Sequence, residues 1–316
     1  MADTQARRSE HPVVLEGLTK RFRRTVALDS VGFILEPGEV FGYLGPNGAG
    51  KTTTIRLLMG MIRPTSGRAR VFGLDVWAEA REVHRLVGYV PGEPSLYPRL
   101  TGREHVAYLG HLRGRDDTAR ARTVAERLGL DLSRRTRTLS RGNRQKLAIV
   151  LAVMSAPRLL VLDEPTSGLD PLVQREFHAL LREHTADGGS VLLSSHILGE
   201  VQRVADRIGV VREGRLVAVE RLADLSGKSL HHIRATFADA VRPDDFAGVT
   251  GVRGLTVDGQ SLTCSAPQSA LDDLLKRVSA HRVIDFECAE AELDEMFLTY
   301  YGGESDALQR VAQDAS

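Results

Sequence analysis

The eight residues GPNGAGKT at 45–52 constrain the fold more than any other part of the sequence, because they fit the pattern GxxxxGK[ST]. They follow an apolar run at 40–44 typical of a buried strand, and a segment with a helical pattern comes next. Glycines there let the backbone curl so that its N–H groups point at phosphate oxygens. A glycine-rich turn with an exposed lysine is the alternative, but all eight positions and both flanks favour phosphate binding.

Within and just after this loop, three side chains have distinct expected roles. Lys51 should reach the β- and γ-phosphates, Thr52 should offer its hydroxyl to magnesium, and Thr53 should contact the α-phosphate. The full set of expected phosphate-binding residues is Gly45, Pro46, Asn47, Gly48, Ala49, Gly50, Lys51, Thr52 and Thr53.

Two acids, Asp163 and Glu164, directly follow a second apolar run at 159–162. In a parallel sheet this strand end faces the ligand crevice, beside the phosphate loop. Asp163 is expected to hold magnesium, in part through water, since magnesium prefers oxygen ligands and keeps some of its hydration. Glu164 is expected to orient or deprotonate an attacking water. The alternative is a polar strand end that only caps the next helix.

Short apolar runs alternate with longer amphipathic ones from residue 13 to about 220, which predicts an α/β fold with a mainly parallel sheet covered by helices. A third strand is expected at 191–193. The apolar positions Leu147, Val150, Leu151 and Met154 lie on one face of a predicted helix. Strands at 208–211 and 216–219 are expected to form a hairpin.

The pattern changes after residue 220. Residues 225–229 are a predicted linker, and the period-two sets around 233–237, 262–264 and 284–288 are typical of half-buried strands. Segments 269–280 and 290–301 are predicted helices. We therefore expect a small α+β domain at 228–302, followed by a polar tail at 303–316.

Charge, cysteine content and the lengths of the apolar runs disfavour several classes of protein. The net charge of +1 gives no support for a nucleic-acid binder that works by bulk electrostatics. The two cysteines, Cys264 and Cys288, lack CxxC spacing, so reduced thiols are expected rather than disulfides or a zinc site. The polar start at 1–11 lacks the apolar segment of a secretory signal, and the longest apolar run, 147–154, is far short of the ~20 residues that cross a bilayer. If the chain serves a membrane, a separate polypeptide should span it.

The segment LSRGNRQK that begins at Leu139 resembles the LSGGQ-type signature of ABC-transporter ATPases. Residues 165–170, PTSGLD, are similar to the D-loop of that family, and Ser194-Ser195-His196 is similar to its switch-histidine segment. The resemblance covers 13 to about 220. It implies an ABC ATPase cassette at 13–222 with the P-loop NTPase fold and a helical signature subdomain, binding ATP and Mg²⁺.

The resemblance also implies roles for individual residues. Ser140 and Gly142, at the start of the predicted helix, would form a second anion site that closes on the γ-phosphate held by another subunit, giving a head-to-tail dimer with two ATP molecules. A simple helix N-cap is the alternative. His196 would reach the γ-phosphate and the attacking water, and Asp170 belongs to the D-loop part of the nucleotide site. Phe22 would stack on adenine, or else be a core phenylalanine.

Two positions depart from the family pattern. Gly92 stands where glutamine is common, so a magnesium contact is missing, and the neighbouring Glu93 could supply it. Arg141 and Asn143 replace glycine and glutamine in the signature. Similar variants occur among drug-resistance exporter ATPases of the daunorubicin and tetronasin type, which pair with a separate permease. The segment LDEMFL at 293–298 resembles the end of the C-terminal extension in that subgroup, where it would pack in the small domain or on the partner subunit.

We therefore expect the ATP-binding subunit of an ABC exporter, a homodimer or paired ATPase bound to a multispan permease at the cytoplasmic face of the cell membrane. Residues 93–112 should lie near the permease. Two other readings remain open: export of a polysaccharide or lipid, and a soluble ABC ATPase of translation or DNA repair. The single cassette and the absence of a heptad run disfavour the second.

Overall fold

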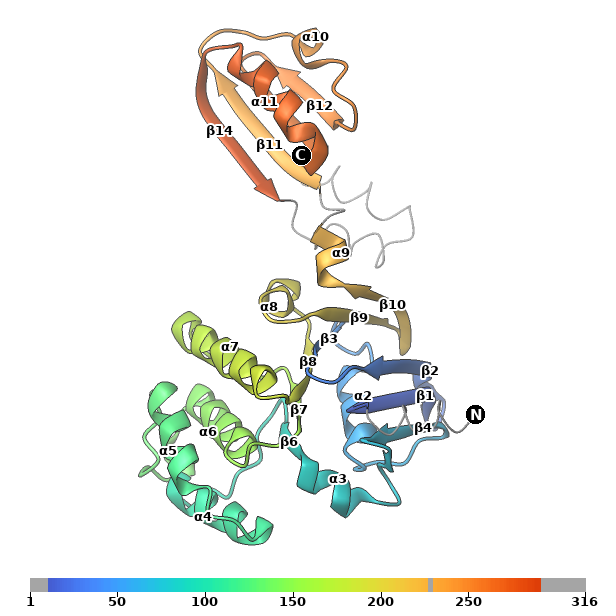
Figure 1. The fold of residues 1–316 in the computed structure, drawn as a ribbon, viewed down its shortest axis with the longest axis vertical. Coiled ribbons are helices and arrows are strands. Elements are labelled where there is room, and N and C mark those ends of the chain that lie inside the picture. Colours follow the sequence, from blue (N-terminus) through green and yellow to red (C-terminus); the bar gives the residue numbers. More distant parts are fainter. Residues whose placement is uncertain (1–10, 227–229, 291–316) are drawn as a thin grey trace. The chain divides into compact units, whose positions relative to one another are not determined.

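The computed structural model describes residues 11–226 and 230–290 of the chain (Figure 1). The chain divides into two compact units, Met1–Glu220 and Arg221–Ser316. All of the candidate site residues lie in the first unit.

A six-stranded sheet with the order β10-β9-β3-β8-β7-β6 forms the centre of the first unit. Its strands are β3 (Val40–Leu44), β6 (Val87–Val90), β7 (Leu159–Asp163), β8 (Ser190–Ser195), β9 (Arg207–Arg212) and β10 (Arg215–Arg221). The pairs β3–β8, β3–β9, β6–β7 and β7–β8 are parallel. Because parallel strands end at one edge, the segments that follow β3, β7 and β8 lie side by side there.

The three buried strands predicted from apolar runs are confirmed as β3, β7 and β8, in which every residue is buried. Burial on both faces is the reason that these strands are continuously apolar rather than alternating. The predicted hairpin is also confirmed as β9 and β10. Its turn residues Glu213 and Gly214 both have a positive φ, as a two-residue hairpin turn requires.

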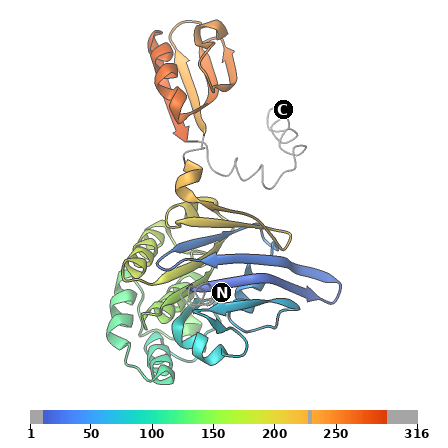
Figure 2. The ribbon, with the colours of Figure 1, turned by 45° about the vertical axis from the view of Figure 1, so that its right-hand side comes forward.

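A second, antiparallel sheet with the order β2-β1-β4-β5 was not expected from the sequence. Its strands are β1 (Val13–Phe22), β2 (Thr25–Leu35), β4 (Ser66–Val71) and β5 (Leu74–Asp75). Figure 2 shows β1 and β2 as the long strands of this layer. The register between them shifts at three places, which breaks the alternation that a regular strand would show.

Helix α2 (Lys51–Leu58) lies between the two sheets of the first unit (Figure 1). Its Ile55, Leu57 and Leu58 belong to one buried cluster with Leu15 of the antiparallel sheet and Phe41 of the parallel sheet. This packing fixes the helix whose first turn carries Lys51 against both layers.

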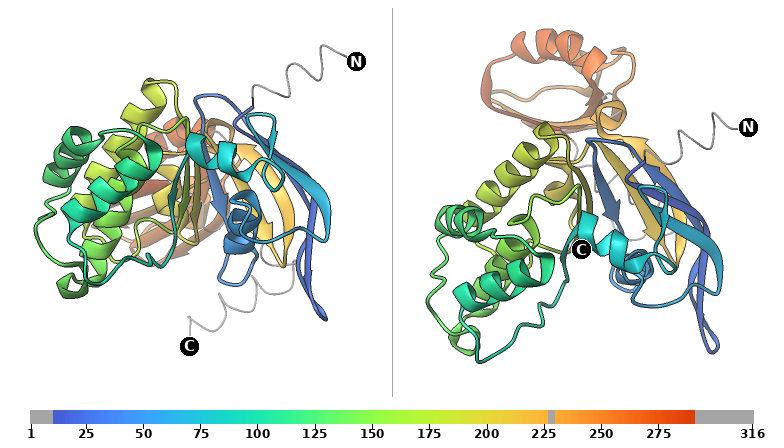
Figure 3. Two further views of the ribbon diagram at one scale, coloured as in Figure 1. Left: turned by 90° about the horizontal axis from the view of Figure 1, so that it is seen from below. Right: turned by 60° about the horizontal axis from the view of Figure 1, so that its bottom comes forward.

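The remaining helices of the first unit include a group on the other side of the parallel sheet, as Figure 3 shows for α4, α5, α6 and α7. Their bounds are α3 (Ala80–Leu86), α4 (Gly102–Arg113), α5 (Thr118–Arg127), α6 (Arg141–Val153), α7 (Pro171–Ala186) and α8 (Leu198–Gln202), with a 3₁₀ turn at Thr136–Thr138. The predicted helical face is confirmed in α6, where Leu147, Val150 and Leu151 are buried. The helix begins at Arg141, before its apolar face, because Ser140 caps it.

The second unit is an antiparallel sheet in the order β12-β13-β11-β14, with one longer helix. Its elements are α9 (Leu222–Ser226), β11 (Leu230–Phe237), α10 (Pro243–Phe246), β12 (Arg253–Asp258), β13 (Ser261–Pro267), a 3₁₀ turn (Gln268–Ala270), α11 (Leu271–Ser279) and β14 (Val283–Glu290). The predicted helix at 290–301, the segment at 293–298 and the tail at 303–316 lie outside the described residues, apart from Glu290 at the end of β14.

The core of this unit bears out two of its three period-two patterns. Ile233, Ala235 and Phe237 are buried, as are Leu262 and Cys264, and burial raises the pKa of the Cys264 thiol to about 11. The third pattern fails in part, because Ile284 is 68% exposed and Cys288 is also exposed. The register between β11 and β14 shifts at Phe237, which places Ile284 outside the alternation. Both cysteines are free thiols.

Candidate functional site: a phosphate loop, an acidic pair and a histidine

The loop at 45–50 joins β3 to α2, and backbone conformation or close contacts favour glycine at its glycine positions. Gly48 and Gly50 have φ values of 82° and 108°, in the region that favours glycine. A Cβ at Gly50 would lie 2.6 Å from Cδ2 of Leu28 and 2.8 Å from the carbonyl oxygen of Ala27. The hairpin end of β1 and β2 therefore packs directly on the loop and holds its curled backbone.

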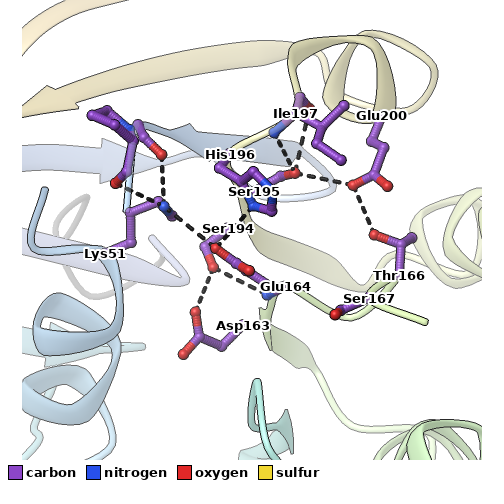
Figure 4. A network of polar contacts seen from close by, with 12 residues as sticks. Lys51, Asp163, Glu164, Thr166, Ser167, Ser194, Ser195, His196, Ile197 and Glu200 are labelled. Carbon is purple, nitrogen blue, oxygen red and sulfur yellow. Dashed lines mark hydrogen bonds and ion pairs between the residues drawn. The ribbon is translucent and has the colours of Figure 1, made fainter. Parts of the chain in front are cut away.

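Lys51 occupies the first turn of α2 with its ammonium group inside the loop. Its Nζ donates hydrogen bonds to the carbonyl oxygens of Gly45 at 2.6 Å and Pro46 at 3.1 Å, and lies 3.4 Å from Oε1 of Glu164 (Figure 4). Only 5% of the side chain is exposed. Burial lowers the pKa of Lys51, while Glu164 and Asp163 act in the opposite direction. The ammonium group of Lys51 is thus held inside the phosphate loop, beside the carbonyl oxygens of Gly45 and Pro46. Thr52 and Thr53 follow, the first exposed and the second half-buried.

Asp163 ends β7 and is 3% exposed. The hydroxyl of Ser194, on the neighbouring strand β8, donates to Oδ1 of Asp163 at 2.6 Å. In the sequence, Ser194 belongs to the segment that resembles the switch-histidine motif, and no role of its own was predicted for it. The hydrogen bond orients the carboxylate, as a supporting group does for a metal ligand.

Glu164 has a φ of 46°, which is uncommon for a residue that is not glycine. Its backbone N–H donates to the carbonyl oxygen of Ser194 at 3.1 Å, which helps to hold this conformation. Such backbone strain persists where surrounding contacts enforce it, often at functional sites. The side chain is 27% exposed and points toward both Lys51 and His196 (Figure 4).

His196 follows β8, and its Nδ1 lies 3.2 Å from the same Oε1 of Glu164. Its side chain is 42% exposed. The structure therefore brings together three of the predicted residues, Lys51, Glu164 and His196, from three different segments of the chain.

The predicted signature residues lie at the start of α6, beside the D-loop at 165–170 of the same chain. Ser140 is the N-cap, and its hydroxyl accepts from the N–H of Asn143 at 3.2 Å. A Cβ at Gly142 would lie 2.7 Å from the carbonyl oxygen of Gly168. Arg141, one of the departures from the family pattern, donates from Nη2 to Oγ of Ser167 at 3.1 Å.

A residue that sequence reasoning missed also joins α6 to the D-loop. The buried side chain of Gln145 donates to the carbonyl oxygen of Pro165 at 3.0 Å. Its amide lies two residues beyond the five-residue signature, between Arg144 and Lys146, so nothing in the sequence distinguishes it from its polar neighbours. At the far end of the D-loop, Asp170 caps α7 by accepting from the N–H of Val173 at 3.0 Å.

Phe22 ends β1 with its ring 47% exposed, so the alternative of a core phenylalanine is wrong. Nζ of Lys20 lies 4.9 Å from the ring centroid and donates to the carbonyl oxygen of Arg63 at 2.7 Å. The ring is therefore steadied by a cation and remains accessible for stacking.

The position of Gly92 adjoins the acidic pair. A Cβ there would lie 3.7 Å from Oδ2 of Asp163, so a longer side chain at this position would reach the carboxylate. Glu93 is exposed. Among the described residues, no three His, Cys, Asp or Glu side chains gather into a group that could hold a metal ion. Thr52 and Asp163 nevertheless suit magnesium bound jointly with phosphate oxygens and water, since its sites commonly use one or two carboxylates plus substrate.

A groove of about 330 Å³ lies near the end of β6, on the side of α4 and α6. Its apolar lining includes Met61, Tyr89, Leu96, Leu109 and Leu151. Nearby, Tyr97, Tyr108 and Leu112 are exposed by 57%, 42% and 63%. Exposed apolar side chains gathered at one place are typical of an interaction surface.

Residues 28–167 match the ABC transporter family. The daunorubicin/doxorubicin resistance ATP-binding protein DrrA of Streptomyces peucetius is 35% identical over 306 residues, which cover 92% of each chain. A protein of Escherichia coli K12 named "Probable multidrug ABC transporter ATP-binding protein YbhF" is 38% identical over 217 residues, or 67% of this chain. This chain spans only 37% of the length of YbhF.

Solved structures of ABC transporter ATP-binding subunits and cassettes also match this chain. An ATP-binding subunit of an ABC transporter matches 68% of this chain and 92% of its own, with a TM-score of 0.65 and 30% identity. The ATP-binding cassette MJ0796, solved as a dimer bound to ADP and Pi, matches 66% and 98% with a TM-score of 0.61 and 25% identity.

The fold and site define an α/β ATPase cassette of the P-loop type. The chain belongs to the ATP-binding proteins of the ABC transporter family, whose cassettes hydrolyse ATP. The predicted resemblance and fold class are thereby confirmed. Among the helices described for residues 11–226 and 230–290, none is long and apolar enough to cross a membrane.

Proposed function

We propose that the chain is the ATP-hydrolysing subunit of an ABC exporter that drives a drug- or antibiotic-like compound through a separate membrane permease. The observation that carries this proposal is the convergence of Lys51 and His196 on one oxygen of Glu164, next to the buried Asp163. This arrangement offers a cation, a polarising acid and a histidine at the edge of the sheet where the phosphate loop lies.

The site residues then have complementary tasks. The N–H groups of 45–53 and Lys51 bind the triphosphate of ATP, and Phe22 stacks on adenine. Thr52 and Asp163 hold Mg²⁺, which neutralises charge on the phosphate oxygens when bound, with Glu93 as a further candidate ligand. Glu164 orients the attacking water and accepts its proton, and His196 contacts the γ-phosphate.

The active form is proposed to be a head-to-tail dimer. Ser140 and Gly142 of one subunit, with Asp170 of its D-loop, would complete the nucleotide site of the other. Two considerations support this. The start of α6 is a second anion-binding end, which a chain that holds one nucleotide in its own phosphate loop does not need, and the MJ0796 cassette was solved as a dimer.

The groove beside β6 and the exposed residues of 93–112 are the proposed docking surface for the permease, which would hold the chain at the cytoplasmic face of the membrane. Cysteine crosslinking from Tyr97 and Leu112 in membranes tests this placement. We expect crosslinks to a multispan protein. Crosslinks that form only to the second unit of this chain would contradict the proposal.

The substrate class rests on the relatives whose names record resistance or transport of antibiotics. DrrA matches along 92% of both chains, and that span takes in at least part of the second unit. We propose that this second unit, expected at 228–302, is an accessory domain of the exporter subunit.

The decisive experiment is purification of the chain with its permease, followed by a screen of compounds for stimulated ATPase activity and for export from loaded vesicles. We expect one or more drug-like compounds to stimulate ATP hydrolysis, and Glu164→Gln to nearly abolish both hydrolysis and export. Stimulation by a lipid or polysaccharide precursor alone would replace the proposed substrate. A chain that hydrolyses no ATP would overturn the function itself.

A further inference from the structure

Glu200, on the short helix α8 directly after the His196 segment, accepts hydrogen bonds from two different parts of the site (Figure 4). Its Oε2 receives the hydroxyl of Thr166 at 2.7 Å and the hydroxyl of Ser195 at 3.0 Å. Both hydroxyl residues are buried, with exposures of 5% and 2%. These two hydroxyls therefore set the geometry of the Glu200 carboxylate.

Ser195 fixes the backbone on either side of His196. Its hydroxyl accepts from the N–H of Ile197 at 3.0 Å, and its carbonyl oxygen accepts from the N–H of Gly45 at 3.3 Å. The Ser195 hydroxyl can donate to Glu200 at 3.0 Å or to the carbonyl oxygen of Ile197 at 3.3 Å, and the charged carboxylate is the nearer and stronger acceptor. Glu200 is thus connected through Ser195 to the backbone around His196.

Thr166 connects the same carboxylate to the D-loop. It lies two residues after Glu164, and the next two residues of the loop contact the start of α6, Ser167 through Arg141 and Gly168 through its packing on Gly142. The signature helix thus contacts the D-loop at Ser167 and Gly168, and Glu200 contacts it at Thr166.

We propose that Glu200 is a positioning residue that couples the D-loop to His196, so that contacts made on the D-loop set the placement of His196 against Glu164. This inference rests on the proposed ATPase function. Loss of the coupling should slow hydrolysis and affect nucleotide binding much less, because the phosphate loop bonds to the backbone carbonyl of Ser195, whereas Glu200 bonds to its hydroxyl.

Glu200→Ala and Glu200→Gln in the full-length chain test the proposal. Both hydrogen bonds go to one oxygen, and the amide of Gln keeps one acceptor oxygen at that place. We expect Glu200→Ala to lower kcat about tenfold or more with KM for ATP changed less than about twofold, since small misplacements of reacting groups are costly. Glu200→Gln should restore most of kcat. Gln202→Ala, on the same helix, is the control and should match the unmodified chain.

Two further variants test the proposal if Glu200→Ala folds poorly. Thr166→Val removes one of the two hydrogen bonds at nearly constant volume, and it should lower kcat with KM preserved. Adding Glu200→Ala to His196→Ala should cause little further loss, because residues that act through one another are not additive.

The proposal is overturned by normal kcat in Glu200→Ala or in Thr166→Val, by a Glu200→Gln variant as slow as Glu200→Ala, or by losses that multiply in the double variant. The ATPase activities of the unmodified chain and of Glu164→Gln show whether the coupling through Glu200 has failed or the proposed ATPase function itself has failed. If the unmodified chain turns over ATP, Glu164→Gln does not, and Glu200→Ala is normal, only the coupling fails. If the unmodified chain neither binds nor hydrolyses ATP, the function fails.

Discussion

Oε1 of Glu164 lies 3.4 Å from Nζ of Lys51, so the acid that follows β7 forms an ion pair with the lysine of the phosphate loop. The lysine is 5% exposed, and its charge is offset by this acid and by two carbonyl oxygens of the loop. A bound triphosphate would compete with Glu164 for the ammonium group. ATP binding should therefore weaken the ion pair and leave Glu164 beside His196, where it can act on water.

Glu164→Gln tests the role of the acid in catalysis. The amide has the same shape but cannot take a proton, so we expect turnover to fall by about 10²–10⁴, the usual contribution of a general base. Binding of ATP should persist, since the substitution also removes the competitor for Lys51. Phosphate release and light scattering of the ATP-bound chain measure the two effects, and a trapped dimer is expected. Unchanged turnover would remove Glu164 from its assigned role.

Lys51→Ala should weaken ATP binding and stop hydrolysis. A hydrogen bond to a charged group contributes about 1.5–3 kcal/mol, which corresponds to a rise in Kd of more than tenfold. Titration with a fluorescent ATP analogue measures the change. Arg56→Ala removes a positive charge from the exposed side of the same helix and is the control. Equal affinities of the two variants would contradict phosphate binding by Lys51.

The parts of the site that could be predicted from sequence are those in which neighbouring residues share one task. The loop at 45–52 and the pair Asp163 and Glu164 are such segments, and the apolar runs before them placed both at strand ends. The parallel sheet then had to bring them together, because all of its central strands end at one edge.

Contacts between distant residues could not be read in this way. Ser194 and Asp163 are paired by the register of β7 with β8, and Thr166 meets Glu200 across 34 positions. The antiparallel sheet could not be predicted because register shifts interrupt the alternating pattern of β1. The exposure of Ile284 could not be predicted because the register of β14 shifts opposite Phe237. Period-two patterns predict burial only while the register is regular.

Ser194→Ala should raise the concentration of Mg²⁺ that gives half-maximal ATPase activity. The variant removes the 2.6 Å hydrogen bond that orients Asp163, and loss of a group that supports a metal ligand commonly costs about 10–100-fold in affinity or activity. ATPase assays over a magnesium series measure this. Ser190→Ala, at the opposite end of β8, is the control, because its hydroxyl accepts from the N–H of Gly38 instead. A parallel shift in both variants would show a general effect on the strand.

Gly142→Ala tests whether the close packing of the signature helix on the D-loop matters for hydrolysis. The added Cβ would meet the carbonyl oxygen of Gly168 at 2.7 Å, which real Cβ atoms do not tolerate, so α6 and the D-loop must separate. If these two segments of one subunit complete the nucleotide site of the other, we expect a fall in kcat of about tenfold to a hundredfold, while ATP binding to the isolated subunit stays normal.

Gly199→Ala is the matched control for this prediction, because a Cβ at Gly199 would have nothing within 4 Å. It should leave the rate unchanged and alter stability only slightly, since alanine is favoured over glycine in a helix. Thermal unfolding of both variants separates a local effect from loss of the fold. A Gly142→Ala variant that retains full turnover would show that the signature helix can retreat from the D-loop at no catalytic cost, and the proposed seam between subunits would then have to be built from other residues.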